Sequence, residues 1–459
     1  MTKTSFKNIG WPLLIVLIMI MLVWSIGAQT PRTDFVLFIS QYLLLFVAFY
    51  ILWLNKWGLG FWQFFGIAVI LRLLLINVAP ELSNDFYRFI WDGELMTKGI
   101  NPFAHTPNEL ISNALFFEDG YMRVLYHGMG ELSQSHYTCY PVLNQFLFFI
   151  PAYLSDSLIY NIIGLKIIVI LADIGAIIIA KKIAEHLKVS VHNIWLYALN
   201  PFIILEFSGN LHFEGVMIFF LLGAIYLIMK NKWIGGGVLF GLAIQIKLIP
   251  LMLIPFVFKK LKWKKSVGFM AMTGLVVMAI GGLMLNQQFF NNMMESVNEY
   301  FVRFQFNSSF YKLIVNFGYT ETDYDRFSIV GKGLSYIATG GILLLALLKA
   351  YRNDLDIIKG MLFAFMIYYS LATTIHPWYI SLILVLSVFT KYKFGVVWSI
   401  IIMISYYSYT LAKPDENSTL MILTVFEYVV IYSLLIYEIR KNWNKKAIGI
   451  QLKSFFGIN

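Results

Sequence analysis

Acidic and basic side chains gather on one face of a helix predicted near residue 85. Ser83 or Asn84 can cap a helix that begins near Asp85, and Asp85, Arg88 and Asp92 then occupy positions i, i+3 and i+7. A carboxylate that faces a partly dry cavity has a raised pKa and can accept the proton of a hydroxyl. The stretch predicts Asp85 as a general base and Asp92 as a second catalytic carboxylate. The alternative is a surface helix that carries an ordinary Asp85–Arg88 ion pair.

A leaving phosphate, if the substrate carries one, would need cationic side chains nearby. Further polar residues stand where predicted helices end or turn, so their side chains can reach the expected site of this phosphate near Asp85. His212 and Glu214 lie at one such turn, and Asn101 precedes a proline that ends the helix begun at Asp85. Interfacial anchoring or structural pairing is the alternative for each. The candidates for binding the phosphate or its substituent are Arg88, Asn101, His212, Glu214, Lys247, Arg303 and His376.

No motif for a metal or a nucleotide cofactor is visible. His136 and Cys139 stand three apart, but no second pair completes a zinc pattern, and Cys139 is the single cysteine. The chain also lacks a P-loop, a dinucleotide-binding glycine pattern and a serine nucleophile elbow. We therefore expect no cofactor; Asp85 and Asp92 together could recruit a divalent metal, but the chemistry does not require one.

The composition excludes an ordinary soluble protein. The chain has 459 residues, of which 59% are hydrophobic and 13% are charged, whereas globular domains are about 45–50% apolar and about 25% charged. The net charge of +10 could suggest a nucleic-acid partner. The basic residues, however, form short clusters between long apolar runs, as in proteins that cross a membrane several times. The sequence predicts one all-α integral membrane domain over 1–459, embedded in a lipid bilayer, with no nucleic-acid partner.

Twelve apolar runs are candidate membrane spans, because crossing the hydrocarbon layer takes about 20 apolar residues. With the N-terminus inside, twenty-two of the thirty-five Lys and Arg residues fall in inner segments and eight in outer ones. This bias places both termini in the cytoplasm and two long loops, 80–157 and 286–327, outside the cell membrane. The first run is interpreted as a retained span and not a cleaved signal peptide. The runs are 11–28, 34–54, 59–79, 158–180, 191–208, 213–230, 266–285, 328–349, 357–374, 378–390, 395–411 and 420–438.

Two further apolar segments do not fit a simple crossing. Residues 141–154 are too short and carry a proline at each end, which predicts a surface-lying helix in the outer loop. Residues 234–258 have basic clusters on both flanks, so a hairpin with Lys247 and Pro250 near its tip satisfies the charge rule better than one span. Both alternatives for 234–258 stay open, and the total is about 12–14 spans.

The stretch SNDFYRFIWDGELMTKGINPF at 83–103 resembles the signature of bacterial polyprenol-phosphate-mannose-dependent mannosyltransferases, a branch of the GT-C glycosyltransferase superfamily. Similar motifs follow in the same order: TCYPVLNQFLFFIPA, LNPFIILEFSGNLHFEG, GLAIQIKLIPLMLIP and IHPWYI. The resemblance implies a GT-C fold, a polyprenyl-phosphate sugar as donor and an extracytoplasmic glycan or lipid as acceptor. It also implies that Asp85 is the catalytic base in the first outer loop, while Phe89, where tyrosine is usual, departs from the pattern.

The expected reaction is a single displacement that inverts the anomeric centre of a hexose, with mannose as the first candidate. Two other functions remain as alternatives: a multispan transporter or flippase for a lipid-linked sugar, and a glycan polymerase or ligase. Transporters often contain inverted repeats, and no repeat is evident in this chain. The sequence leaves open the sugar, the acceptor, the linkage position and the oligomeric state.

Overall fold

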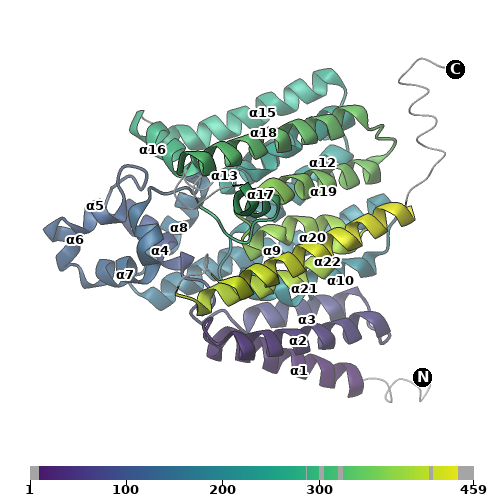
Figure 1. Cartoon of the computed structure of the whole chain (residues 1–459), viewed down its shortest axis with the longest axis horizontal. Coiled ribbons are helices and arrows are strands. Elements are labelled where there is room, and N and C mark those ends of the chain that lie inside the picture. The colour runs from purple at the N-terminus through teal and green to yellow at the C-terminus, as the bar shows by residue number, and fades with distance from the viewer. Residues whose placement is uncertain (1–9, 286, 299–303, 319–323, 413–416, 443–459) are drawn as a thin grey trace.

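The computed structural model describes residues 10–285, 287–298, 304–318, 324–412 and 417–442. Within these ranges the chain is helical, and its one recorded bridge between extended segments joins Phe306 to Thr374. Most helices run side by side as a bundle, and α4 to α8 gather at one end of it (Figure 1). The predicted all-α bundle is thus confirmed.

Among the residues that the structure describes, six helices are long and apolar enough to cross a membrane. Only 17% to 44% of the residues in their apolar windows are buried, so most of these side chains face outward, where lipid would cover them. The protein is therefore a multi-pass membrane protein. The six are α1 (Gly10–Gln29), α2 (Phe35–Asn55), α9 (Leu158–Leu187), α15 (Trp263–Gly281, continued by η4, Gly282–Met284), α18 (Tyr324–Leu348) and α22 (Ser418–Asn442).

The other six predicted runs are also helical, but they are short, interrupted or charged. Pro201–Gly209 and Glu214–Met229 meet at 114° and make a seventh span if the bent pair counts as one. The structure thus gives fewer full-length spans than the 12–14 expected, because proline and polar residues break several runs inside the bundle, where protein satisfies the backbone. These runs form α3 (Phe61–Leu73), η1 (Val191–Ile194), α10 (Trp195–Ala198), α11 (Pro201–Ile203), η2 (Ile204–Gly209), α12 (Glu214–Met229), α19 (Asp354–Leu371), η6 (Pro377–Ile380), α20 (Ser381–Ser387), α21 (Phe394–Ile401) and η7 (Ile402–Thr410).

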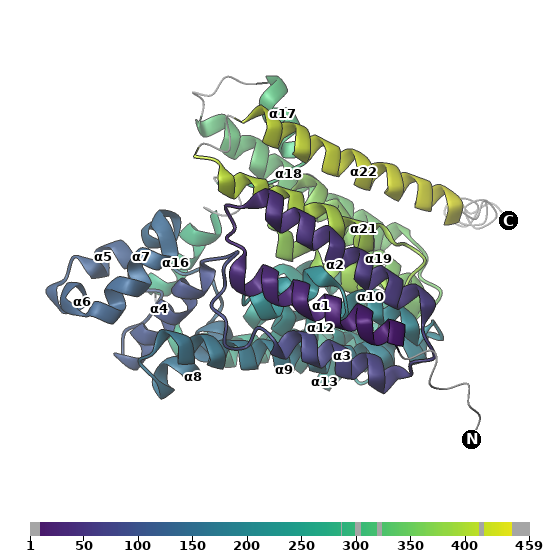
Figure 2. The ribbon, with the colours of Figure 1, turned by 90° about the horizontal axis from the view of Figure 1, so that it is seen from below.

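The predicted first loop, 80–157, folds into five helices beyond the end of the spans (Figure 2). α8 has 13 residues and is about 20 Å long, too short to cross a bilayer, and it packs against α4. The two helices touch at Gly93, where a Cβ atom would overlap the carbonyl oxygen of Phe148. The helices are α4 (Asp85–Thr97), α5 (Pro107–Ile111), α6 (Ala114–Glu118), α7 (Gly120–Ser135) and α8 (Val142–Leu154); the second loop contains α16 (Gln287–Asn298) and α17 (Phe310–Gly318).

Residues 233–260 form the helical hairpin that the charge pattern favoured. α13 (Trp233–Ile246) lies against α12, and helical geometry breaks at Lys247, whose φ and ψ are −154° and 139°. The chain returns through η3 (Ile249–Leu253) and α14 (Ile254–Lys260). Lys247 contacts Glu214 at the start of α12, whereas Lys260 lies beside Met229 at the end of α12. The hairpin tip is therefore at the same end of the bundle as the first residues of α12.

A buried ion pair joins α3 to α9 in the interior of the bundle. Arg72 Nε donates to Asp173 Oδ2 at 2.7 Å, and both side chains are fully buried. The Tyr197 hydroxyl donates to the other Asp173 oxygen at 2.6 Å. Each oxygen of the carboxylate therefore has a donor, which a buried charge requires.

Replacing Asp173 by Ala leaves the Arg72 charge buried without a partner, and we expect a loss of about 3–5 kcal/mol in the free energy of unfolding. Denaturant titration in mixed detergent micelles measures the loss. Asp356→Ala is the matched control, because its ion pair with Lys359 is partly exposed and contributes about 0–1 kcal/mol. An Asp173→Ala protein as stable as the control would contradict the structural role of the pair.

Candidate active site

A cavity of about 710 Å³ opens between the α4–α8 end and the helices of the bundle. Its polar lining comes mainly from the start of α4, from α7, from the first residue of α12 and from the hairpin tip. Its apolar lining comes mainly from η3 and α18. The polar lining residues include Ser83, Asn84, Asp85, Glu131, Glu214 and Lys247, and the apolar ones include Leu248, Ile249, Leu251, Met252, Ala338 and Ile342.

Asp85 lies in this cavity at the first position of α4. Its backbone N–H donates to Ser83 Oγ at 3.3 Å, and its side chain is 30% exposed. Burial and the neighbouring Glu214 raise the pKa of Asp85, while His212, Lys247 and Arg32 lower it. The carboxylate thus sits among opposing charges at the wall of a cavity, within reach of a molecule that enters it.

Lys247 reaches the cavity from the break in the hairpin. Its ammonium group pairs with the Glu214 carboxylate and lies 4.4 Å from the ring centre of Tyr379. Lys247 remains 29% exposed, whereas Glu214 is almost fully buried. The cation is therefore held in place by a carboxylate and an aromatic ring while one side stays open to the cavity.

His212 stands directly behind Asp85, on an irregular stretch of backbone. The π-helix η2 ends at Gly209, and Leu211 has a φ of 66°, which is uncommon for a residue with a side chain. This conformation brings His212 Nε2 to 3.9 Å from Asp85 Oδ2 and Nδ1 to 2.8 Å from Glu206 Oε2. Strained backbone of this kind is often retained where it positions functional groups.

His376 lines the cavity within a column of stacked rings. Its ring lies 4.5 Å from Trp378 and 4.9 Å from Phe306, with interplanar angles of 2° and 25°. Trp378 in turn stacks on His212 at 3.7 Å. Burial, with Lys247 and His212 nearby, lowers the pKa of His376 to about 3. His376 is therefore a neutral ring at physiological pH and does not supply the positive charge that the sequence suggested.

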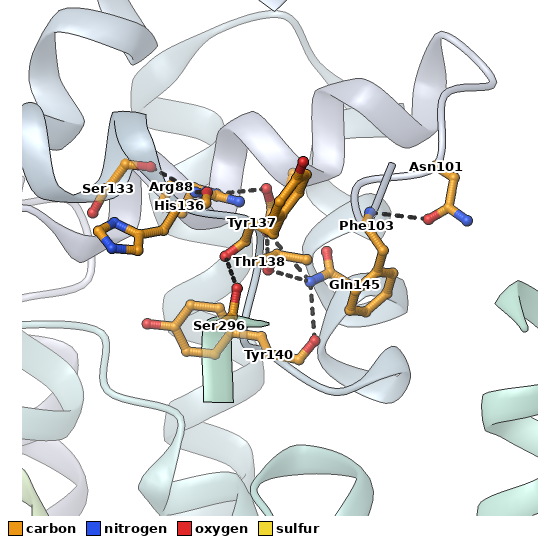
Figure 3. Close-up of polar contacts among 11 residues, drawn as sticks. Arg88, Asn101, Phe103, Ser133, His136, Tyr137, Thr138, Tyr140, Gln145 and Ser296 are labelled. Carbon is orange, nitrogen blue, oxygen red and sulfur yellow. Dashed lines mark hydrogen bonds and ion pairs between the residues drawn. The ribbon is translucent and has the colours of Figure 1, made fainter. Parts of the chain in front are cut away.

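The structure places Arg88 and Asp92 outside the cavity lining, facing each other one turn apart. Arg88 Nε donates to Asp92 Oδ1 at 2.8 Å, and Arg88 Nη1 donates to the carbonyl oxygens of Ser133 and His136 (Figure 3). Thr138 Oγ1 donates to Asp92 Oδ2 at 2.6 Å. Both side chains are buried and hold residues 133–138 against α4, while Arg88 Nη2 is buried without a hydrogen-bond partner among the described residues.

Of the two remaining candidates, the structure describes only Asn101. Asn101 Oδ1 accepts the backbone N–H of Phe103 at 3.0 Å (Figure 3), and neither residue lines the cavity. Arg303 lies outside the described residues. The sequence therefore identified Asp85, His212, Glu214, Lys247 and His376, which the structure brings together, and Arg88, Asp92 and Asn101, which it places elsewhere.

One charged neighbour of Asp85 was not singled out from the sequence. Arg32, between α1 and α2, places Nη1 3.4 Å from Asn84 Oδ1 and its guanidinium 4.8 Å from the ring centre of Tyr409. An isolated arginine in a short loop carries no motif, and its contact with Asn84 spans 52 residues of sequence. Only the folded chain reveals it.

Among the residues that the structure describes, no three His, Cys, Asp or Glu side chains group as metal ligands would. Cys139 lines the cavity as a free thiol, and burial raises its pKa to about 11. The site as described is thus a carboxylate, a lysine and a histidine beside an apolar wall. The expectation that no cofactor is needed stays a prediction.

Comparison with known proteins identifies the family. Residues 15–263, more than half of the chain, match the model described as alpha-(1->6)-mannopyranosyltransferase, N-terminal domain, and residues 312–439 match the MptB C-terminal domain. A curated relative, alpha-(1->6)-mannopyranosyltransferase A of Corynebacterium glutamicum, is 24% identical over 187 residues, which cover 40% of this chain and 36% of the relative. The matched segment thus spans about a third of that relative. The matches confirm the resemblance to mannosyltransferases, and the chain belongs to the alpha-(1->6)-mannopyranosyltransferase family.

Proposed function

We propose that the protein transfers mannose from a polyprenyl-phosphate donor to an extracytoplasmic glycan or lipid acceptor, with Asp85 as the base. The observation that carries the proposal is the cavity itself, in which Asp85 and Lys247 share one space with an apolar wall. A hydroxyl acceptor needs the carboxylate, a leaving phosphate needs the cation, and a polyprenyl chain needs the apolar surface. Family membership supports mannose as the sugar.

The apolar wall supports a lipid donor in particular. It is formed by the hairpin tip and α18, and Leu251 of the tip is 43% exposed. A polyprenyl chain that covers such surface gains about 25 cal/mol for each Å² of apolar area removed from water. Lys247 directly precedes this wall in the chain, so a lipid lying on the wall can present its phosphate to the lysine.

The proposed reaction is a single displacement. The acceptor hydroxyl loses its proton to a carboxylate oxygen of Asp85 as its oxygen bonds to the anomeric carbon. The bond from that carbon to the phosphate oxygen breaks on the opposite face, and the electron pair leaves with polyprenyl phosphate beside Lys247. The transition state resembles an oxocarbenium ion, which the Glu214 carboxylate can also stabilise. The anomeric configuration inverts.

The family name adds a stereochemical condition to this proposal. If this chain forms an alpha-(1->6) linkage, as the name of the family describes, an inverting step requires a donor in which mannose is β-linked to phosphate. The charge bias of the loops supports a site on the extracytoplasmic side, with both termini in the cytoplasm.

The test is a transfer assay with the purified protein in liposomes, supplied with radiolabelled polyprenyl-phosphate mannose and a mannan acceptor. We expect label to enter the acceptor in a new α-linkage. Passage of the intact donor across the bilayer without cleavage would instead indicate a flippase. Transfer only of a whole lipid-linked oligosaccharide would indicate a polymerase or ligase.

A further inference from the structure

The His212 imidazole lies between two carboxylates that come from different parts of the chain. Nδ1 is 2.8 Å from Glu206 Oε2, and Nε2 is 3.9 Å from Asp85 Oδ2. The side chains of His212 and Glu206 are 2% and 0% exposed, whereas that of Asp85 is 30% exposed. The row of three groups therefore runs from the interior of the protein to the cavity wall.

The surroundings of Glu206 suit an ionised carboxylate. The Tyr406 hydroxyl donates to Oε1 at 2.8 Å, and Asn210 Nδ2 donates to Oε2 at 3.2 Å. Both groups act as hydrogen-bond donors here, so each oxygen of the Glu206 carboxylate accepts a hydrogen bond. A buried negative charge also needs a positive charge beside it, and the basic side chain of His212 lies against it, with Nδ1 2.8 Å from Oε2.

The same geometry suits a protonated imidazole. A proton on Nδ1 can face Glu206 Oε2 at 2.8 Å, and a positive charge on the ring also suits the Asp85 carboxylate, whose Oδ2 lies 3.9 Å from Nε2. The ring also stacks on Trp378 at 3.7 Å with an interplanar angle of 22°. A cation over a tryptophan face is stabilised by the negative potential of that face.

We infer that Glu206 and His212 are positioning residues, which hold an imidazolium behind Asp85 so that the Asp85 carboxylate stays ionised and free to accept a proton. The inference rests on the proposed function, in which Asp85 is the base. The 3.9 Å separation is too long for a hydrogen bond. The imidazolium thus stabilises the negative charge without occupying the oxygen that the acceptor hydroxyl needs.

The charged neighbours of Asp85 shift its pKa in both directions. Burial and Glu214 raise the pKa of Asp85, and His212, Lys247 and Arg32 lower it. A charged His212 adds a third cation to Lys247 and Arg32 near Asp85 and favours its ionised form, whereas a neutral His212 leaves Lys247 and Arg32 as the described groups that lower its pKa. The titratable groups around Asp85 are His212, Lys247, Glu214, Arg32, Tyr379, Tyr409 and Cys139. Beyond Asp85 and each other, His212 and Glu206 have His376, Tyr406 and Tyr42 as titratable neighbours.

The test measures the electric field at position 85 without using catalysis. The double variant Asp85→Cys with Cys139→Ser carries one thiol, and its rate of reaction with a methanethiosulfonate reagent against pH gives the thiol pKa. Adding His212→Gln removes the nearby positive charge, and we expect the thiol pKa to rise by about one to three pH units. Adding Glu206→Gln should also raise the thiol pKa, but by less. Without the Glu206 carboxylate the imidazolium loses its proton, so one negative and one positive charge disappear together. The positive charge lies nearer to position 85, so its loss has the larger effect.

The matched control is His376→Gln, which changes the other histidine stacked on Trp378. The ring of His376 is neutral, so the thiol pKa should not move. An unchanged or lower thiol pKa after His212→Gln would overturn the inference, and so would an equal rise after His376→Gln. If Glu206→Gln does not fold, His212→Gln against its control decides alone.

The transfer assay gives a second readout. In the chain with Asp85 intact, His212→Gln should move the acidic limb of the rate profile to higher pH, with the rate largely restored at alkaline pH. A merely structural residue would lower the rate equally at every pH. If the unmodified protein transfers no mannose, the proposed function fails, while the thiol titration still decides whether the imidazolium is present.

Discussion

Asp85→Asn lowers the rate of mannose transfer by about 10²- to 10⁴-fold, the usual contribution of a general base. The amide keeps the size of the carboxylate but cannot accept a proton, so the acceptor hydroxyl stays a poor nucleophile. The KM for the lipid donor should change little, because the donor binds through its phosphate and its chain. Initial rates in liposomes, measured across donor concentrations, separate the two parameters.

Asp119→Asn is the matched control for Asp85→Asn. Asp119 caps α7 in the same predicted loop, accepting the backbone N–H groups of Tyr121 and Met122, and asparagine caps helices equally well. Its transfer rate should equal that of the unmodified chain.

The transfer rate should also depend on pH through Asp85. Because burial raises the pKa of Asp85, activity of the unmodified chain should fall as the pH drops through that raised value. Full activity of Asp85→Asn would remove the base assignment.

Lys247→Met should lower kcat/KM for the lipid donor by about 10²- to 10³-fold, as the loss of one charged donor at a developing anion does. Polyprenyl phosphate gains negative charge as it leaves, so part of the loss appears in kcat. The substitution also leaves Glu214 buried without its cation. The combined variant Lys247→Met with Glu214→Gln removes that second effect.

Two comparisons make the Lys247 result specific. The combined variant should regain thermal stability relative to Lys247→Met while its transfer rate stays low. Lys359→Met removes a lysine from another ion pair, with Asp356 in the first turns of α19, and should leave transfer unchanged. If the combined variant recovered full transfer, Lys247 would serve only to neutralise Glu214.

The core of the site could be predicted because its members stand at turns between apolar runs. Asp85, Glu214 and Lys247 each begin or end a helix at the same end of the bundle, so topology alone brings them together. The hairpin tip followed from the basic clusters on both flanks of 234–258. These inferences needed only span direction, which the loops encode.

Arg88 and Asp92 show where helical periodicity stops being informative. The spacing placed Asp85, Arg88 and Asp92 on one face of α4, but that face passes through two environments. Its first turn borders the cavity, while one and two turns later, at Arg88 and Asp92, it meets the segment 133–138 and α8. Which partner covers each turn depends on long-range packing that no local pattern contains. The Arg32 contact was missed for the same reason.

The hydropathy pattern also could not predict the number of full-length membrane spans. Hydropathy finds apolar runs, but a run that Pro201 or Pro377 interrupts can stay inside the bundle as short helices. The π-helix at Ile204–Gly209 and the positive φ of Leu211 arise in one such interrupted run. That irregular backbone is what turns His212 toward Asp85.

The most direct test measures whether the side chain at position 85 is accessible from outside the cell and whether the bound donor covers it. Cells that express Asp85→Cys with Cys139→Ser are treated with a membrane-impermeant thiol reagent from outside, with and without added polyprenyl-phosphate mannose. The account predicts labelling in intact cells and protection by the lipid donor. Labelling only after the cells are opened, or labelling that the donor does not slow, would contradict it.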